Sequence, residues 1–170
     1  ETTTEATTEA TTEPTTEPTT EPTEPPIPLN RFSPEDFEFQ GDYLACNSEW
    51  YLRGIDVSKY QDYVDWQQVK DAGMSFAMIR VGFRGYGEKG NMVEDDMAQT
   101  NYWGAKEAGL MVGAYFFSQA TTVEEAVEEA RLAIDMLRKY RITYPVAFDM
   151  ETIHEEEARI DTLTVSERTE

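Results

Sequence analysis

The sequence predicts an α/β fold in which parallel strands alternate with helices. Four short apolar segments have strand character, and a helical pattern follows each of the first three. Strand–helix alternation of this kind is typical of parallel β-α-β units. Four strands are too few to close a barrel. The pattern therefore corresponds either to the first half of a (β/α) barrel or to a small open α/β sheet.

The first two units of this pattern occupy the middle of the chain. Residues 52–58 (LRGIDVS) form the first predicted strand, and Asp65 can cap a helix that Gly73 ends. Residues 75–81 (SFAMIRV) form the second predicted strand. A helix is expected after it, over roughly residues 94–108, because apolar residues there recur at helical spacing.

The third and fourth units follow directly. Residues 110–117 (LMVGAYFF) form the third predicted strand, and a T-x-x-E capping box begins a helix at Thr122. This helix is expected to run to about Tyr140, with alanines and a leucine on one stripe and glutamates opposite. Residues 144–151 (YPVAFDME) form the fourth predicted strand, and residues 163–170 are expected to begin another helix.

The N-terminal part of the chain is expected to lie outside this fold. Residues 1–30 are rich in threonine, glutamate and proline and bury too little apolar surface to offset their chain entropy. Such a tract is predicted to be a disordered linker that spaces extracellular modules, or simply a solvated tail. The expected organisation is thus a linker at 1–30, a connecting segment at 31–50 and a partial (β/α) barrel domain at 51–170.

The charge of the chain excludes several classes of partner. The formal net charge is −20, and the part of the chain after the linker is still strongly acidic. Binding to nucleic acid or to an anionic membrane surface requires a basic patch, so neither is expected. No apolar run approaches the ~20 residues of a membrane span. No signal peptide is visible, but the chain starts inside a threonine-rich repeat, so further sequence is expected upstream.

Cysteine and histidine limit the available chemistry. The single cysteine, Cys46, either pairs outside this chain or is a small buried hydrophobe. The single histidine, His154, lies among charged residues and is expected in a solvated loop. One of each is too few for a zinc site of cysteine and histidine ligands. We therefore expect no metal and no other cofactor, and a chemistry that uses carboxylates.

Side-chain alternation favours the barrel over the open sheet. Residues two apart on a strand point the same way, so Asp149 and Glu151 share a face with Ala147. In the first strand, Gly54 and Asp56 share a face with bulky aliphatic residues opposite. Small or polar side chains inside and bulky ones outside suit a barrel with a polar site at the carboxyl ends of its strands.

The acidic pair at the end of the fourth strand is the main candidate for catalysis. Asp149 and Glu151 are about 6.6 Å apart at ~3.3 Å per residue, and adjacent carboxylates raise the pKa of one of them. Such a proton donor is what cleavage of a glycosidic bond requires, although acidic residues at strand ends also serve as helix caps. Asp56 should face the same barrel mouth, which favours catalysis. Arg80 either joins these residues from the second strand or forms a structural ion pair.

A glycine motif in the chain suggests a competing function. Residues 85–90 (GYGEKG) match the G-x-G-x-x-G pattern of dinucleotide-binding folds. In those folds the motif opens a helix, whereas here the next helix is expected several residues later. Glu88 would also lie near the pyrophosphate. A flexible loop over the barrel mouth is the favoured interpretation.

Four segments together resemble a known enzyme family. GIDVSKYQ, VDWQQVKDAGMSFAMIRVGF, GAYFFSQA and PVAFDMET occur in this order over residues 53–152. They are similar to glycoside hydrolase family 25 lysozymes, also called Chalaropsis-type N-acetylmuramidases. The resemblance implies an irregular TIM-like (β/α) barrel that hydrolyses the β-1,4 bond between N-acetylmuramic acid and N-acetylglucosamine in peptidoglycan.

The resemblance also implies roles for individual residues. Glu151 corresponds to the proton donor, Asp149 to its partner, which orients or stabilises the developing charge, and Asp56 to a supporting aspartate. Tyr115 and Phe117 correspond to aromatic residues that line the sugar groove. Arg80 is expected with them as a substrate-binding residue. The protein is then expected to be a secreted or cell-wall-associated bacterial enzyme that acts as a monomer.

The sequence departs from the family pattern in two places. Phe116 stands where the family often has histidine. Family members also continue through further strands and another acidic residue, whereas this sequence ends at Glu170 after four recognisable strands, so we expect a truncated domain. Two other functions remain open: a chitinase-like hydrolase, which shares the D-x-E motif, and a non-catalytic module that binds cell-wall glycan.

Overall fold

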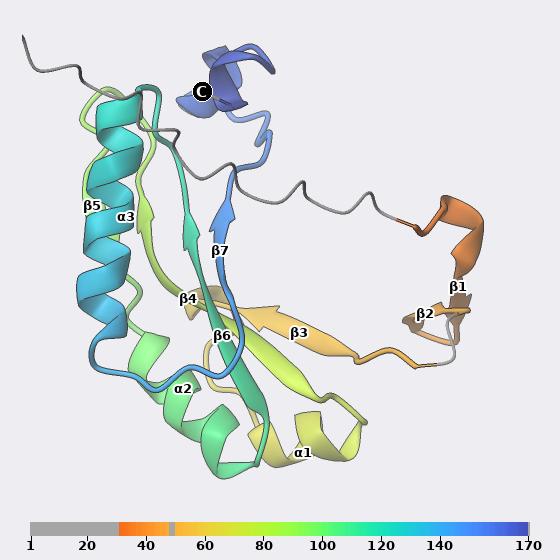
Figure 1. Ribbon diagram of the computed structural model, residues 1–170. Coiled ribbons are helices and arrows are strands. Elements are labelled where there is room, and N and C mark those ends of the chain that lie inside the picture. The colour runs from red at the N-terminus through yellow and green to blue at the C-terminus, as the bar shows by residue number, and fades with distance from the viewer. Residues whose placement is uncertain (1–30, 48–49, 170) are drawn as a thin grey trace, which may run out of the picture. The chain divides into compact units, whose positions relative to one another are not determined.

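A computed structural model describes residues 31–47 and 50–169 (Figure 1). These residues fall into two compact units, which divide between Asn47 and Ser48. The predicted linker at 1–30 lies outside the described residues. The first unit contains an antiparallel hairpin of β1 (Phe37–Gln40) and β2 (Tyr43–Cys46), preceded by a 3₁₀ turn at Pro34–Asp36. The segment predicted only as a connection therefore has regular structure of its own.

The second unit is a mixed α/β fold built on a mainly parallel sheet. The parallel strands lie in the order β3 (Gly54–Val57), β4 (Phe76–Arg84), β6 (Met111–Phe117) and β7 (Val146–Asp149), and β5 (Met92–Glu94) pairs antiparallel with β4. The helices are α1 (Trp66–Asp71), α2 (Ala98–Glu107) and α3 (Val123–Leu137). The prediction of four parallel strands alternating with helices is confirmed, whereas β5 was not predicted.

The capping residues expected from the sequence begin two of the helices. The Asp65 side chain accepts a hydrogen bond from the Gln68 backbone N–H at the start of α1. The Thr122 side chain accepts a hydrogen bond from the Glu125 backbone N–H at the start of α3. The prediction for α2 was wrong at its first turn. Residues 92–94 are recruited into β5, so the helix begins only at Ala98.

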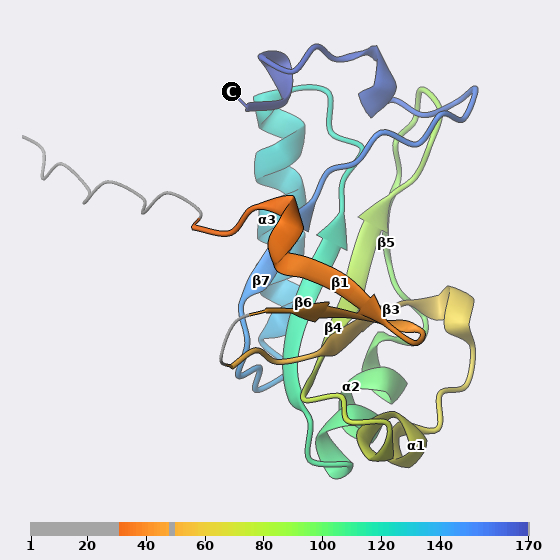
Figure 2. The ribbon, with the colours of Figure 1, turned by 90° about the vertical axis from the view of Figure 1, so that its right-hand side faces the viewer.

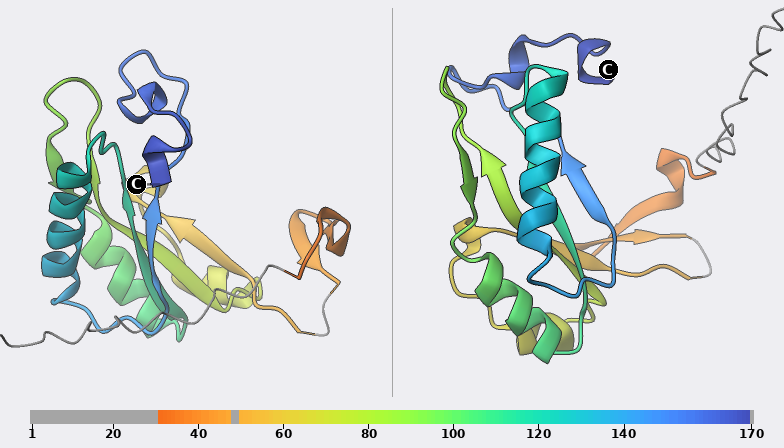
Figure 3. Two further views of the ribbon diagram at one scale, coloured as in Figure 1. Left: turned by 45° about the horizontal axis from the view of Figure 1, so that its top comes forward. Right: turned by 60° about the vertical axis from the view of Figure 1, so that its left-hand side comes forward.

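The three helices pack on one face of the sheet (Figures 1 and 3). On this face α1 and α2 contribute Trp66 and Tyr102 to a buried apolar cluster with strand residues such as Ile79. Toward the carboxyl ends of the strands, Phe116 of β6 packs with Ala133 and Met136 of α3. Val57 of β3, one of the aliphatic residues that alternation placed opposite Asp56, belongs to the first cluster. The opposite face carries Asp56 together with Met78, its neighbour in the register, and Phe76.

A β-bulge in β4 sends two arginines to opposite faces of the sheet. The register with β6 shifts between Arg80, which pairs with Tyr115, and Gly82, which pairs with Phe116. Arg84, beyond the bulge, therefore faces α3 and donates a 2.7 Å hydrogen bond from Nε to the buried carboxylate of Glu129. Arg80, before the bulge, remains on the other face.

The segment after β7 crosses above the carboxyl ends of β6 and β7 (Figures 1 and 2). Arg159 anchors it: its guanidinium pairs with Glu125 at 2.6 Å and donates to the Gln119 carbonyl. The helix expected at 163–170 was wrong, because the described part contains only a 3₁₀ turn at Glu167–Thr169. Glu170 lies outside the described residues.

The sheet is open at β7 within the described part of the chain. Val146 and Phe148 of this strand point toward the helix side, yet they are 47% and 49% exposed. The four described parallel strands form an open sheet, as expected from their number. No described helix is both long enough and apolar enough to cross a membrane.

Two glycines let large side chains lie flat across the polar face. A Cβ on Gly113 would come within 2.5 Å of the Met78 sulfur and 2.7 Å of the Pro145 carbonyl oxygen, which is backbone. A Cβ on Gly54 would overlap the Phe76 ring. Residues with side chains at these positions would displace the neighbouring strand or the side chains across the sheet.

We therefore expect Gly113→Ala to destabilise the fold by about 1–3 kcal/mol, because the new methyl group is overpacked against the chain entering β7. Urea unfolding would measure the loss. The matched control is Gly85→Ala, whose Cβ would meet only the Asn91 carbonyl oxygen at 3.6 Å; it should be neutral or slightly stabilising. Equal stability of the two variants would contradict this account of β6.

Candidate active site

The three acidic residues singled out in the sequence line one open pocket. Asp56, Asp149 and Glu151 surround it together with Tyr115 and neighbouring strand residues, and its volume is about 400 Å³. Asp56 comes from β3, Asp149 is the last residue of β7, and Glu151 follows two positions later. The structure therefore brings together residues nearly a hundred positions apart in the sequence.

The strand register places these carboxylates on the same face of the sheet. Asp56 lies beside Met78 of β4, which in turn lies beside Gly113 of β6. Asp149 lies beside Phe117. All of these residues occupy the same face of the sheet. The Met78 side chain lies across Gly113 and lines the pocket between the two acidic strands.

The surroundings of Asp149 in the pocket shift its pKa. Burial raises the pKa of Asp149, the nearby Glu151 and Asp56 carboxylates raise that pKa further, and the Arg80 guanidinium opposes them. Asp149 is half-buried, whereas Asp56 and Glu151 are exposed. The sequence predicted that one carboxyl of the pair would have a raised pKa, and the structure assigns this effect to Asp149.

Tyr115 supplies a neutral hydroxyl between the carboxylates. Burial raises the pKa of Tyr115 to about 12, and the charges of Asp56 and Asp149 act in the same direction. Arg80 and a hydrogen bond with Ser58 lower the pKa of Tyr115 but do not cancel the effect. The Tyr115 hydroxyl therefore stays protonated at any physiological pH. It can donate a hydrogen bond to an acceptor in the pocket.

Arg80 faces the same side of the sheet as the carboxylates and also forms an ion pair. Its Nε donates to a carboxylate oxygen of Asp95 at 2.8 Å, and both side chains are buried. Its guanidinium lies 5.0 Å from the Tyr60 ring centre and 4.9 Å from that of Phe83. The ion pair considered from the sequence is thus present, on the face that carries the site.

Aromatic residues near the pocket come from more segments than the sequence suggested. Phe117 forms an edge-to-face contact with Tyr86, with ring centroids 6.4 Å apart. Burial raises the pKa of Tyr86, with smaller contributions from Tyr60, Glu155 and Glu151, so Tyr86 stands near the acidic rim. Neither Tyr60 nor Tyr86 was predicted. The available signal was an exposed aromatic residue in each of the loops that follow the first two strands.

Phe116 belongs to the core and not to the site. It alternates with Tyr115 and Phe117 along β6, is 2% exposed and packs toward α3. The residue at which the sequence departs from the family pattern therefore lies on the helix-facing side of the sheet.

The glycine motif forms the hairpin loop between β4 and β5. The Gly85 backbone N–H donates to the Asn91 carbonyl, and that of Gly87 donates to the Glu157 carbonyl in the segment after β7. Gly87 and Gly90 adopt positive φ angles of 74° and 45°. No helix begins within the motif, which contradicts the nucleotide-binding interpretation. The loop expected to be flexible is held by defined hydrogen bonds.

The remaining candidate groups contribute no site. His154 is exposed, and its backbone N–H donates to the Asp161 carboxylate at 2.7 Å. Cys46 lies half-buried in β2. Within residues 31–47 and 50–169, no group of three or more histidine, cysteine or acidic side chains is arranged to hold a metal ion.

A parallel β/α sheet with acidic residues at the carboxyl ends of its strands is an arrangement typical of glycoside hydrolases. A family model described as glycosyl hydrolases family 25 matches residues 55–168. The chain belongs to glycosyl hydrolase family 25. The resemblance indicated by the four sequence segments is thereby confirmed.

Individual relatives agree with this assignment. Lysozyme M1 of Streptomyces globisporus is 41% identical over 68 residues, which are 40% of this chain and 21% of the relative. The chain therefore spans about a fifth of that protein's length.

Two solved structures share the fold. A family 25 glycosyl hydrolase from Bacillus anthracis has a TM-score of 0.56 at 23% identity, covering 81% of this chain and 56% of that chain. The modular autolysin LytC of Streptococcus pneumoniae has a TM-score of 0.53 at 24% identity, covering 62% of this chain and 24% of that chain. A second structure of this autolysin contains a synthetic peptidoglycan ligand. At these identities the likeness shows the fold alone.

The raised pKa of Asp149 has a measurable effect on stability. The folded state binds this proton more tightly than the unfolded state, so the stabilisation is present at low pH and is lost as the pH rises through the folded pKa. Asp149→Asn should therefore unfold at a higher temperature than the unaltered chain at pH 7. The difference should shrink toward pH ~3.9, the ordinary value for aspartate.

Thermal unfolding at both pH values measures this effect. Asp135→Asn, on the exposed side of α3, is the matched control and should show no comparable gain. A gain for Asp149→Asn that is equal at both pH values would mean that charge is not its cause.

Proposed function

We propose that this chain carries part of a muramidase that hydrolyses the β-1,4 bond between N-acetylmuramic acid and N-acetylglucosamine in peptidoglycan. One observation carries the proposal: Asp56, Asp149 and Glu151 share one pocket at the carboxyl ends of the parallel strands in a family 25 chain. The similarity to Lysozyme M1 and to an autolysin solved with a peptidoglycan ligand supports this substrate class.

Glu151 is the proposed general acid. It follows β7 and is exposed at the rim, where the oxygen of the scissile bond can approach it from solvent. Protonation of that oxygen is required as the bond breaks, because a sugar alkoxide is a poor leaving group. Glu151 thus delivers the proton to the departing sugar while positive charge develops on the other one.

Asp149 and Asp56 are proposed to act on the sugar that becomes positively charged. Asp149 is half-buried deeper in the pocket, and its carboxylate stabilises this charge through space or orients the group that reacts with it. Asp56 adds a second negative charge from the opposite side. The Tyr115 hydroxyl donates a hydrogen bond to a sugar oxygen. Phe117 and Tyr86 offer aromatic rings against which a sugar can pack.

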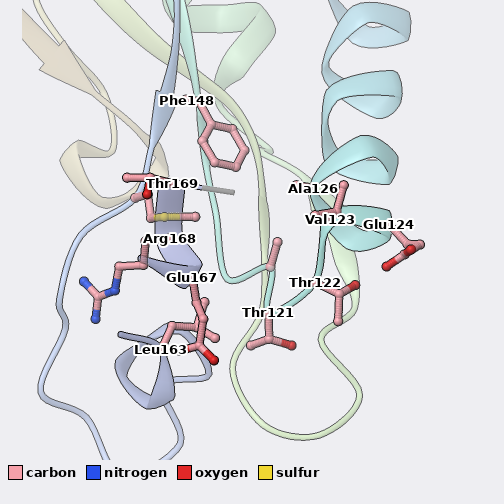
Figure 4. A pocket seen from close by; sticks show the side chains of 12 residues that line it. Thr121, Thr122, Val123, Glu124, Ala126, Phe148, Leu163, Glu167, Arg168 and Thr169 are labelled. Carbon is pink, nitrogen blue, oxygen red and sulfur yellow. The ribbon is translucent and has the colours of Figure 1, made fainter. Parts of the chain in front are cut away.

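The open edge of β7 supports a larger barrel. Phe148, the start of α3 and the C-terminal segment line a groove of about 570 Å³. Figure 4 shows the side chains that line it. Val123, Val127 and Ile134 of α3 are also exposed nearby. Further β/α units that pair with β7 and cover these side chains would close an irregular TIM-like barrel. The longer relatives are consistent with such units.

The proposed protein acts outside the cell or at the cell wall, where peptidoglycan is found. In this proposal residues 1–30 are a spacer, residues 31–50 connect it to the barrel, and residues 51–170 are the first part of the catalytic domain. The protein is proposed to work as a monomer and without a cofactor, because a carboxylate mechanism needs neither a second subunit nor a metal ion.

The acid assignment predicts a specific kinetic defect. In a form extended through the further β/α units, Glu151→Gln should reduce turnover by about 10²–10⁴-fold, because the amide cannot protonate the leaving oxygen. Binding to glycan should persist. Release of reducing ends from purified peptidoglycan and sedimentation with cell walls would measure the two properties.

The matched control for this variant is Glu156→Gln, an exposed glutamate in the loop after β7. It should retain activity. Near-normal turnover in Glu151→Gln would show that another group is the acid.

The barrel proposal predicts that activity depends on the further units. We expect the extended form to release reducing ends from peptidoglycan and this 170-residue chain to release few or none, because one side of its sheet is open. Activity in both would mean that the later strands are not required. Wall binding without release in both would favour a non-catalytic binding module, and products from chitin oligomers instead would favour a chitinase-like enzyme.

A further inference from the structure

Asp95 connects three segments of the chain through one buried carboxylate. It lies between β5 and α2 and is 2% exposed. It accepts hydrogen bonds from Arg80 Nε of β4 at 2.8 Å, from the Lys59 backbone N–H after β3 at 3.1 Å, and from the Met97 backbone N–H before α2 at 3.0 Å. The sequence pattern alone did not single out this residue.

The Asp95 carboxylate fixes where the Arg80 side chain lies. Arg80 is on the site-facing side of β4, beside Tyr115 in the register. Its guanidinium lies against the rings of Tyr60 and Phe83, 5.0 Å and 4.9 Å from their centres. A buried guanidinium without a carboxylate partner is costly. Asp95 therefore offsets the cost of keeping Arg80 at this position.

Arg80 is the cation on the site-facing side of β4 that acts on Asp149. The Lys59 ammonium lies near it, 4.9 Å from the Phe83 ring centre. The charges that act on Asp149 come from Glu151 after β7, Asp56 of β3 and Arg80 of β4, and of these only Arg80 is cationic. Tyr115 of β6 faces the same pocket as a neutral hydroxyl. Asp95 bonds directly to Arg80, so we expect it to influence Asp149 through the position of the Arg80 guanidinium.

We propose that Asp95 is a positioning residue of the carboxylate site: it holds Arg80 on the inner face of β4, where Arg80 balances the negative charge of Asp56, Asp149 and Glu151. The proposal rests on the proposed function only in that these carboxylates are the reacting groups. A purely structural ion pair would support the fold equally well but would leave the ionisation of Asp149 unchanged when it is removed.

The test is a nuclear magnetic resonance titration of the Asp149 side-chain carboxyl in the 170-residue chain, with the signal assigned by its loss in Asp149→Asn. Arg80→Met should raise the Asp149 pKa, because the opposing cation is gone. Arg80→Lys, which keeps the charge, should restore it at least in part. An Asp149 pKa that is the same in Arg80→Met as in the unaltered chain would overturn the proposal.

The contribution of Asp95 is tested by a double-variant cycle. Asp95→Asn should raise the Asp149 pKa, because Arg80 without its partner turns away from the site toward solvent. In the Arg80→Met background the same change should have no further effect. If Asp95→Asn leaves the Asp149 pKa unchanged, Arg80 stays in place without Asp95. If the pKa falls, Arg80 moves toward the carboxylates or the lost Asp95 charge acts on Asp149 directly. Either result contradicts the positioning role.

Two further measurements separate this result from nonspecific effects. Arg138→Met, which removes an exposed cation of α3, is the charge-matched control and should leave the Asp149 pKa in place. In the unaltered chain, the Arg80 Nε–H signal should exchange slowly with water and shift as Asp149 titrates. An Nε–H signal that exchanges rapidly and ignores this titration would overturn the proposal even if the variants fail to fold.

These titrations do not depend on turnover. If peptidoglycan cleavage fails while the titrations succeed, the proposed function is wrong and the positioning role of Asp95 stands. If the titrations fail while cleavage succeeds, only the positioning role is wrong.

Discussion

The pairing of β4 with its neighbours on both sides is the constraint on which the second unit, residues 50–169, depends. One edge of β4 pairs with β3 and β5 and the other with β6, so its register sets the position of the whole sheet. The bulge after Arg80 changes which face each later side chain occupies. It thereby assigns Arg80 to the site and Arg84 to the packing of α3. One irregularity in one strand supplies a cation to each face.

The two faces of the sheet differ in polarity and in their contribution to stability. The helix-facing side is apolar and buries strand residues such as Ile79 and Phe116 under the helices. The other side carries Asp56, Asp149 and Glu151. Burial of Asp149, together with repulsion from the other two carboxylates, raises the pKa of Asp149 and opposes folding at neutral pH. A site that costs stability in this way requires support from elsewhere, which the apolar packing under the helices provides.

Much of the site followed from alternation along single strands. Because side chains of a strand point to alternate faces, the order of residues in the fourth strand was enough to place Asp149 on the side of Ala147 and Phe148 on the opposite side. The same reasoning failed where regularity failed. The bulge in β4 and the pairing of the short strand β5 depend on contacts with distant residues. Local pattern contains no information about such contacts.

The sequence by itself determined the order of strands and helices, the face on which each regular strand residue lies and the family to which the chain belongs, because these depend on local periodicity and on short motifs. Only the tertiary structure decided which groups act on one another. Asp95 meets Arg80 across 15 positions, and Tyr86 reaches Phe117 from another loop. Which carboxyl has the raised pKa was also decided there. Burial and distance between charges set a pKa, and neither exists until the strands are assembled.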